Sequence, residues 1–63
     1  MDNKLLYFRN KNNLSQKEVA KAINKTTSYY GMLETSKRKP SIEVAYLLAD
    51  FFKTTIEEIF FKN

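Results

Sequence analysis

The chain has 63 residues, 43% of them hydrophobic, which suffices for one small domain around a single core. It contains no cysteine and no histidine, and this excludes disulfides, Cys/His metal sites and histidine-dependent catalysis. Eleven basic against seven acidic residues give a net charge of +4, which by itself favours a polyanionic partner only weakly. We expect a single domain over residues 1–63, with no enzymatic activity, metal or cofactor.

The basic residues are concentrated in the first two thirds of the chain. Residues 1–40 hold nine basic and three acidic residues, a net charge of +6, whereas residues 41–63 carry a net charge of −2. This division is expected where one part of a protein faces phosphate. The longest nearly apolar run, residues 44–52, is far shorter than the roughly 20 residues that span a bilayer, and the N-terminus has no signal-peptide pattern. We therefore expect a cytoplasmic protein without a membrane partner.

Caps and the spacing of apolar residues predict five helices and no strands. The first helix is predicted from about Asn3 to Lys11, followed by two asparagines that tolerate the left-handed conformation. It is expected to bury Leu5 and Phe8, with Leu6 as a further candidate.

A capping box marks the start of the second helix. The Ser15 hydroxyl is placed to accept from a backbone N–H of the first turn, and Glu18 can reach back to the N–H of Ser15. Asn24 is expected to end this helix. Its apolar stripe consists of Val19, Ala20 and Ile23.

The third helix is predicted from Thr27 to Ser36, with Thr26 as its cap. Pro40 follows soon after, and the residue before a proline is disfavoured in helices, so the segment 37–40 cannot continue it. At about 100° per residue, the core-facing arc consists of Tyr29, Tyr30 and Leu33. The opposite arc is uncharged and mostly small, and it consists of Thr27, Ser28, Gly31, Met32 and Thr35.

Two further caps predict the last two helices. Ser41 caps a fourth helix that ends near Lys53, and a second capping box, Thr55 to Glu58, opens a short fifth helix. The main apolar face of the fourth helix consists of Ile42, Val44, Ala45, Leu48, Ala49 and Phe52. The apolar residues of the fifth helix are Ile56, Ile59 and Phe60.

The fourth helix carries more apolar surface than one core requires. Its apolar residues extend over roughly 220° of the circumference, against the ~100° stripe of a typical surface helix. We expect an exposed apolar patch, covered most simply by a second copy of the chain in a homodimer. The predicted dimer interface consists of Leu47, Phe51, Ile59 and Phe61.

The second and third helices are separated only by residues 24–26, too few for an antiparallel pair and suited to a sharply crossed one. Ala20 supplies a small side chain where such helices touch, and Asn24 can adopt the positive φ that the turn requires. This spacing predicts a helix-turn-helix whose third helix enters a DNA major groove. The flanking basic residues predicted to bind phosphates are Lys25, Lys37, Arg38 and Lys39.

A resemblance to a known family supports this interpretation. The residues that carry it are Leu14-Ser15-Gln16, Glu18-Val19-Ala20, the turn at Asn24, Leu33-Glu34, Lys37-Arg38 and Pro40-Ser41-Ile42-Glu43. They resemble the phage-repressor and Cro-type helix-turn-helix family (Xre family), and the match extends from Leu5 to Phe60 without a gap. The resemblance implies a compact, all-α, five-helix, lambda-repressor-like domain. It also implies a homodimeric transcriptional regulator that binds double-stranded DNA. Such regulators occur in bacteria, phages and plasmids and usually act as repressors.

The resemblance also implies roles for individual residues. Gln16 corresponds to a glutamine that binds a backbone phosphate. Arg9 and Glu34 correspond to an ion pair between the first and third helices. The residues at base-reading positions are Thr27, Ser28 and Met32. Those near phosphate contacts are Thr35, Lys37 and Lys39.

Other features of the third helix leave alternatives open. Tyr29, at the edge of the core arc, is a candidate for contacting a base or a phosphate. Gly31 inside a helix costs roughly 1 kcal/mol relative to alanine, which close approach to DNA, a close helix contact or simple evolutionary drift would explain. Asn24 and Lys25 depart from the family, which prefers glycine and an apolar residue there.

The predicted reading face lacks the side chains that discriminate bases best. No Arg, Lys, Asn or Gln lies between Thr27 and Ser36, so we expect modest sequence discrimination or A·T-leaning sites. The alternative function is a protein-interaction module, antitoxin-like or a regulatory partner, in which this face binds protein and DNA binding is weak.

Overall fold

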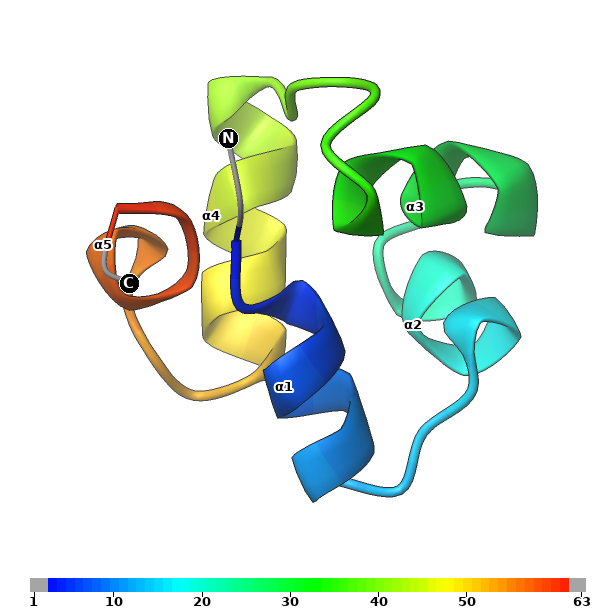
Figure 1. The fold of residues 1–63 in the computed structure, drawn as a ribbon, viewed down its shortest axis with the longest axis horizontal. Helices are drawn as coiled ribbons and strands as arrows, with labels where there is room; N and C mark the ends of the chain where they lie inside the picture. The colour runs from blue at the N-terminus through cyan, green and yellow to red at the C-terminus, as the bar shows by residue number, and fades with distance from the viewer. Residues whose placement is uncertain (1–2, 62–63) are drawn as a thin grey trace.

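The computed structural model describes residues 3–61, which form five α-helices and no strands (Figure 1). The all-α class predicted from the sequence is confirmed. The helices are α1 (Leu5–Lys11), α2 (Gln16–Ala22), α3 (Thr27–Glu34), α4 (Ile42–Phe51) and α5 (Ile56–Phe60).

Side-chain caps fix the start of four helices. The hydroxyls of Ser15, Thr26, Ser41 and Thr55 each accept a hydrogen bond from the backbone N–H three residues later, at 3.0 to 3.1 Å. At Ser15 the predicted capping box is complete, because the Glu18 carboxylate accepts from the Ser15 N–H at 2.8 Å. Each cap satisfies an N–H that the first helical turn leaves unpaired, so these residues determine where the helices begin.

The N-terminal end of α1 is connected to α3 through Asn3. The Asn3 side-chain oxygen accepts from the Leu5 N–H at 2.9 Å, and its amide donates to the Leu33 carbonyl at 2.8 Å. Asn3 therefore precedes α1 and is not its first residue. The helix begins two residues later than the sequence predicts.

Left-handed residues follow four of the helices. Asn13, Asn24, Ser36 and Lys53 have φ between 55° and 60°. Asparagine tolerates this region better than most residues, so the turns after α1 and α2 follow from the sequence. The left-handed Ser36 also explains why α3 ends at Glu34, earlier than predicted.

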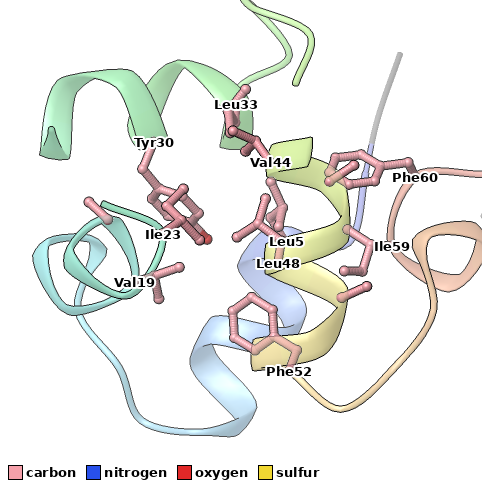
Figure 2. Packing of buried hydrophobic residues seen from close by; sticks show 13 residues of the cluster. Leu5, Val19, Ile23, Tyr30, Leu33, Val44, Leu48, Phe52, Ile59 and Phe60 are labelled. Carbon is pink, nitrogen blue, oxygen red and sulfur yellow. The ribbon is translucent and has the colours of Figure 1, made fainter. Parts of the chain in front are cut away.

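The core lies where the five helices converge (Figure 2). The largest fully buried side chains are Tyr30, Leu5, Ile23, Leu33, Leu48, Ile59 and Val19. Burying an apolar side chain of this size contributes about 1.5–3 kcal/mol relative to leaving it exposed. Phe8 is half-buried and stacks on Phe52 with ring centroids 5.7 Å apart. The predicted core residues of α2 and α3 are confirmed.

Two residues expected to contribute to the core do not. Leu6 is 48% exposed, because it lies about 100° around α1 from the buried Leu5. Ile42 is 75% exposed and lies at the rim of a groove between α4 and α5.

The apolar patch predicted over α4 and α5 is also wrong as a single surface. Ile59 is fully buried in the core and contributes nothing to the exterior. On α4, Leu47 and Phe51 lie together on one edge of the buried stripe, about 140° or more from Ile42 on the other edge. The exposed face between these edges is occupied by Tyr46 and by the acidic residues Glu43 and Asp50. Over α4 and α5, the described residues therefore present two separate exposed apolar edges.

The arrangement separates α3 from the contact between α4 and α5. In Figure 1, α2 and α3 lie on one side of α4 and α5 lies on the other. The described residues extend 24 × 22 × 19 Å. No helix within residues 3–61 has the length and apolar character needed to cross a membrane.

Candidate nucleic-acid interface

A four-residue connection joins α2 to α3. The Lys25 N–H donates to the Ala20 carbonyl at 2.9 Å, and Asn24 adopts a φ of 60°. Ala20 is itself buried, so a small side chain lies where α2 meets the rest of the core. Short connections of this kind produce the crossed helix pair of a helix-turn-helix.

The two faces of α3 differ as the sequence predicts. Tyr30 and Leu33 are buried and Tyr29 is half-buried against the core. The exposed side chains on the opposite face are Thr27, Ser28 and Thr35, and Gly31 and Met32 are partly exposed beside them. This face is therefore accessible and uncharged, and it consists mostly of small side chains.

Four exposed basic residues flank α3. Lys25 precedes it, and Lys37, Arg38 and Lys39 follow it. After α3 the chain folds back, because the N–H groups of Lys37 and Arg38 both donate to the Met32 carbonyl, at 2.9 and 3.2 Å. The fold-back holds the basic segment next to the C-terminal half of α3.

Tyr29 contacts two of these basic residues. The Lys25 ammonium lies 5.5 Å and the Arg38 guanidinium carbon 5.1 Å from the centroid of the Tyr29 ring. Both distances are within the ~6 Å range of a cation–π interaction. One aromatic ring therefore connects the segments before and after α3.

A polar network connects α1, α2 and α3 beneath this surface. Arg9 pairs with both oxygens of Glu34, through Nε to Oε2 and through Nη2 to Oε1 at 3.2 Å. Arg9 also donates to the Leu14 carbonyl at 3.0 Å, and the Gln16 amide donates to Glu34 at 3.1 Å. The side chains of Arg9 and Glu34 are only 16% and 6% exposed, so this ion pair is largely removed from water.

The network changes the pKa values of its members. Burial alone would raise the pKa of Glu34, but hydrogen bonds, first from Arg9, and the Arg9 charge lower it below its ordinary value. The same hydrogen bond, donated by Arg9 to Glu34, raises the pKa of Arg9. Burial and the neighbouring Glu34 carboxylate raise the pKa of Tyr30 well above its usual range. Glu34 is therefore held ionised beside a neutral tyrosine.

The sequence matches a family model described as helix-turn-helix over residues 5–59. An uncharacterized HTH-type transcriptional regulator of Methanocaldococcus jannaschii is 38% identical over 60 residues, which cover 95% of this chain and 91% of the relative. The chain belongs to the helix-turn-helix family of transcriptional regulators. Two uncharacterized HTH-type transcriptional regulators of Archaeoglobus fulgidus are 37% and 33% identical, with 84% and 86% of each relative covered and 95% of this chain. These relatives are archaeal, and a bacterial or phage origin stays a prediction.

In this helix-turn-helix protein, two of the side chains predicted to bind phosphate have intramolecular partners. Gln16 uses one amide N–H on Glu34 and retains a second N–H for another acceptor. The single hydroxyl proton of Thr35 is donated to the Gly31 carbonyl at 3.1 Å. Thr35 would have to change this partner before donating to a phosphate.

Of the two cation–π contacts of Tyr29 in this helix-turn-helix protein, the sequence suggests only the one with Lys25. Lys25 and Tyr29 are only four residues apart, so their contact is local in the sequence, although Lys25 lies in the turn before α3 and not in the helix. Arg38 has no such signal, because its approach to Tyr29 depends on the reversal of the chain after α3.

The surroundings of Gly31 remove one explanation for this glycine. A methyl group at Gly31 would lie 3.7 Å from the Gln16 amide, an ordinary van der Waals contact. Its φ is not positive, so neither helix packing nor backbone conformation requires glycine here. Close approach to DNA and simple evolutionary drift remain as explanations.

We expect Gly31→Ala to stabilise the protein by about 1 kcal/mol, because alanine has the higher helix propensity. Urea unfolding followed by circular dichroism measures this change. We also expect the variant to bind DNA more weakly, since the added methyl reduces how closely α3 can approach a groove. DNA affinity equal to that of the wild type would show that the glycine is not needed for binding.

Proposed function

We propose that this helix-turn-helix protein represses transcription by binding a palindromic operator as a homodimer, with α3 in the major groove of each half-site. The observation that carries the proposal is the exposed, uncharged face of α3 between exposed cations at both of its ends. Such a face can approach base edges closely while the cations neutralise phosphates on either side.

Base reading is assigned to Thr27, Ser28 and Met32, with Gly31 allowing close approach. The two hydroxyls can hydrogen-bond to several bases, and the Thr27 methyl and the Met32 side chain can contact thymine methyls. These groups discriminate less than a bidentate Arg or Gln does. The proposed operator is therefore A·T-leaning, with DNA shape contributing to its recognition.

Phosphate binding is assigned to the side chains around this face. The free N–H of Gln16 and the ammonium groups of the flanking lysines supply donors. Phosphate contacts of this type fix orientation and add affinity that decreases with salt. The proposed phosphate-binding residues are Gln16, Lys25, Thr35, Lys37, Arg38 and Lys39.

The proposed homodimer uses one of the two exposed apolar edges. Ile42 and Phe61 are 75% and 71% exposed and line an apolar groove of about 430 Å³ between α4 and α5. Leu47 and Phe51, on the other edge, are less exposed. We favour the groove edge, because covering it with a second copy removes more apolar surface from water. Two domains of this size side by side can also span the ~34 Å between successive major grooves.

Two matched charge substitutions on α4 test the interface. We expect Ile42→Glu to dissociate the dimer, because it places a charge in an apolar contact, and Leu47→Glu to leave it intact. Sedimentation at tens of micromolar measures both. Dissociation by Leu47→Glu alone would place the interface on the Leu47–Phe51 edge. A 7.4 kDa species for the wild type would exclude the homodimer at this concentration.

The proposed function is tested by selecting duplexes from a random DNA library with the purified protein at near-physiological salt. We expect an enriched palindrome with half-sites about one helical turn apart. Binding without enrichment that disappears as salt rises would contradict specific readout. That outcome would favour the protein-interaction alternative, and the next step would be a search for a protein partner.

A further inference from the structure

Three segments of the chain meet at the ring of Tyr29. Lys25 comes from the turn before α3, Tyr29 lies in the first half of α3, and Arg38 comes from the segment that folds back after it. The two cationic groups lie 5.5 and 5.1 Å from the same ring centroid. Lys25 and Arg38 are thirteen positions apart in the sequence, so this convergence is produced by the tertiary structure.

The ring is fixed more firmly than the two cations it contacts. Tyr29 is half-buried and packs against the hydrophobic core, whereas Lys25 and Arg38 are exposed. Backbone hydrogen bonds fix the bases of both cationic side chains, from Lys25 to Ala20 and from Arg38 to Met32. What remains free is rotation along two long side chains, and an aromatic face restricts that rotation by attracting the charged ends.

We propose that Tyr29 is a positioning residue for phosphate binding. Its ring holds the Lys25 ammonium and the Arg38 guanidinium beside α3 before DNA arrives, so that a DNA backbone meets a preformed pair of cations. This proposal rests on the proposed binding of duplex DNA through α3. A cation–π contact orients a cation without neutralising it, so both charges stay available to phosphates. The two cationic side chains are then already ordered in the folded protein, so DNA binding costs less conformational entropy.

This role differs from direct base reading by Tyr29, and a double-mutant cycle separates the two. The cycle compares the wild type, Tyr29→Leu, the pair Lys25→Gln and Arg38→Gln, and all three changes together, by DNA affinity at fixed salt. We expect Tyr29→Leu to weaken binding about ten-fold on all sequences alike, because two side chains must then be ordered on binding. In the background without the two cations, the same change should have no further effect. Tyr29→Phe keeps the aromatic face and should bind like the wild type.

Two results of the cycle would overturn the proposal. One is a Tyr29→Leu variant that binds as well as the wild type. The other is a decrease in affinity that persists when both cations are absent, which would indicate direct interaction of the ring with DNA. If the wild type binds no duplex at all, the proposed function fails and not the arrangement at Tyr29.

An NMR measurement on the free wild-type protein tests the arrangement without DNA. A cation held over the ring places the ε-methylene protons of Lys25 and the δ-methylene protons of Arg38 in its shielding region. We expect upfield shifts for both, and their disappearance in Tyr29→Leu. Unshifted protons in the wild type would overturn the positioning role, whatever the DNA affinity.

Discussion

Replacing Arg9 with methionine is expected to destabilise the protein by about 3 kcal/mol. Methionine fills much of the same volume but removes the charge, so Glu34 is left almost fully buried without its counter-ion. Restoring hydration or protonating the carboxylate both cost free energy. For a domain of this size such a decrease is a large part of the total stability, so unfolding in urea should be followed by circular dichroism at low temperature.

A double variant and a surface control make this prediction specific. Arg9→Met combined with Glu34→Leu removes both charges and should be closer to the wild type than Arg9→Met alone, because no buried charge remains unpaired. Lys17→Met on the exposed face of α2 makes the same kind of exchange and should change stability by less than about 0.5 kcal/mol. An Arg9→Met effect as small as that of Lys17→Met would mean that the ion pair contributes little.

The acid dependence of stability provides a second measurement on the same pair. The folded pKa of Glu34 lies below its ordinary value of 4.5, so its ionisation stabilises the folded protein fully above that pH. This contribution is lost as the pH falls from 4.5 through the folded pKa. Glu34→Gln removes it, so we expect the free energy of unfolding to fall less steeply with acid in the variant. Glu18, whose pKa is lowered by hydrogen bonds from Ser15, contributes equally to both proteins.

Replacing Lys37, Arg38 and Lys39 together with glutamine is expected to weaken DNA binding on every sequence alike. All three side chains are exposed next to α3, and removing one cation that binds a phosphate should reduce the slope of log affinity against log salt by about one. If all three cations bind phosphates, the slope falls by about three. Fluorescence anisotropy with one specific and one random duplex, at several salt concentrations, measures both quantities.

A variant with the same reduction in charge controls for net charge alone. Lys11, Lys17 and Lys21 are exposed on α1 and α2, where we expect a solvated face. Replacing these three with glutamine should change the salt slope much less. Equal effects from the two triple variants would mean that only the net charge of the protein attracts DNA. Unchanged affinity in the first variant would favour a protein partner over a phosphate-binding surface.

Local patterns in the sequence determined most of the fold. Ser15, Thr26, Ser41 and Thr55 start helices because a hydroxyl three residues before a backbone N–H satisfies it wherever the helix packs. Asn24 ends α2 because asparagine tolerates a positive φ. The spacing of Tyr30 and Leu33 likewise specified the buried side of α3, so the uncharged outer face followed directly.

The tertiary structure decided which surfaces come together. The sequence predicts one apolar patch of Leu47, Phe51, Ile59 and Phe61, but the packing of α5 buries Ile59, and Leu47 and Phe51 lie on a different edge from Phe61. The contact of Arg38 with Tyr29 and that of Gln16 with Glu34 depend on where the chain reverses and on how α2 crosses α3. Periodicity specifies the direction of a side chain around its own helix axis. The neighbour it meets depends on how the helices pack against one another, which is determined by the whole core.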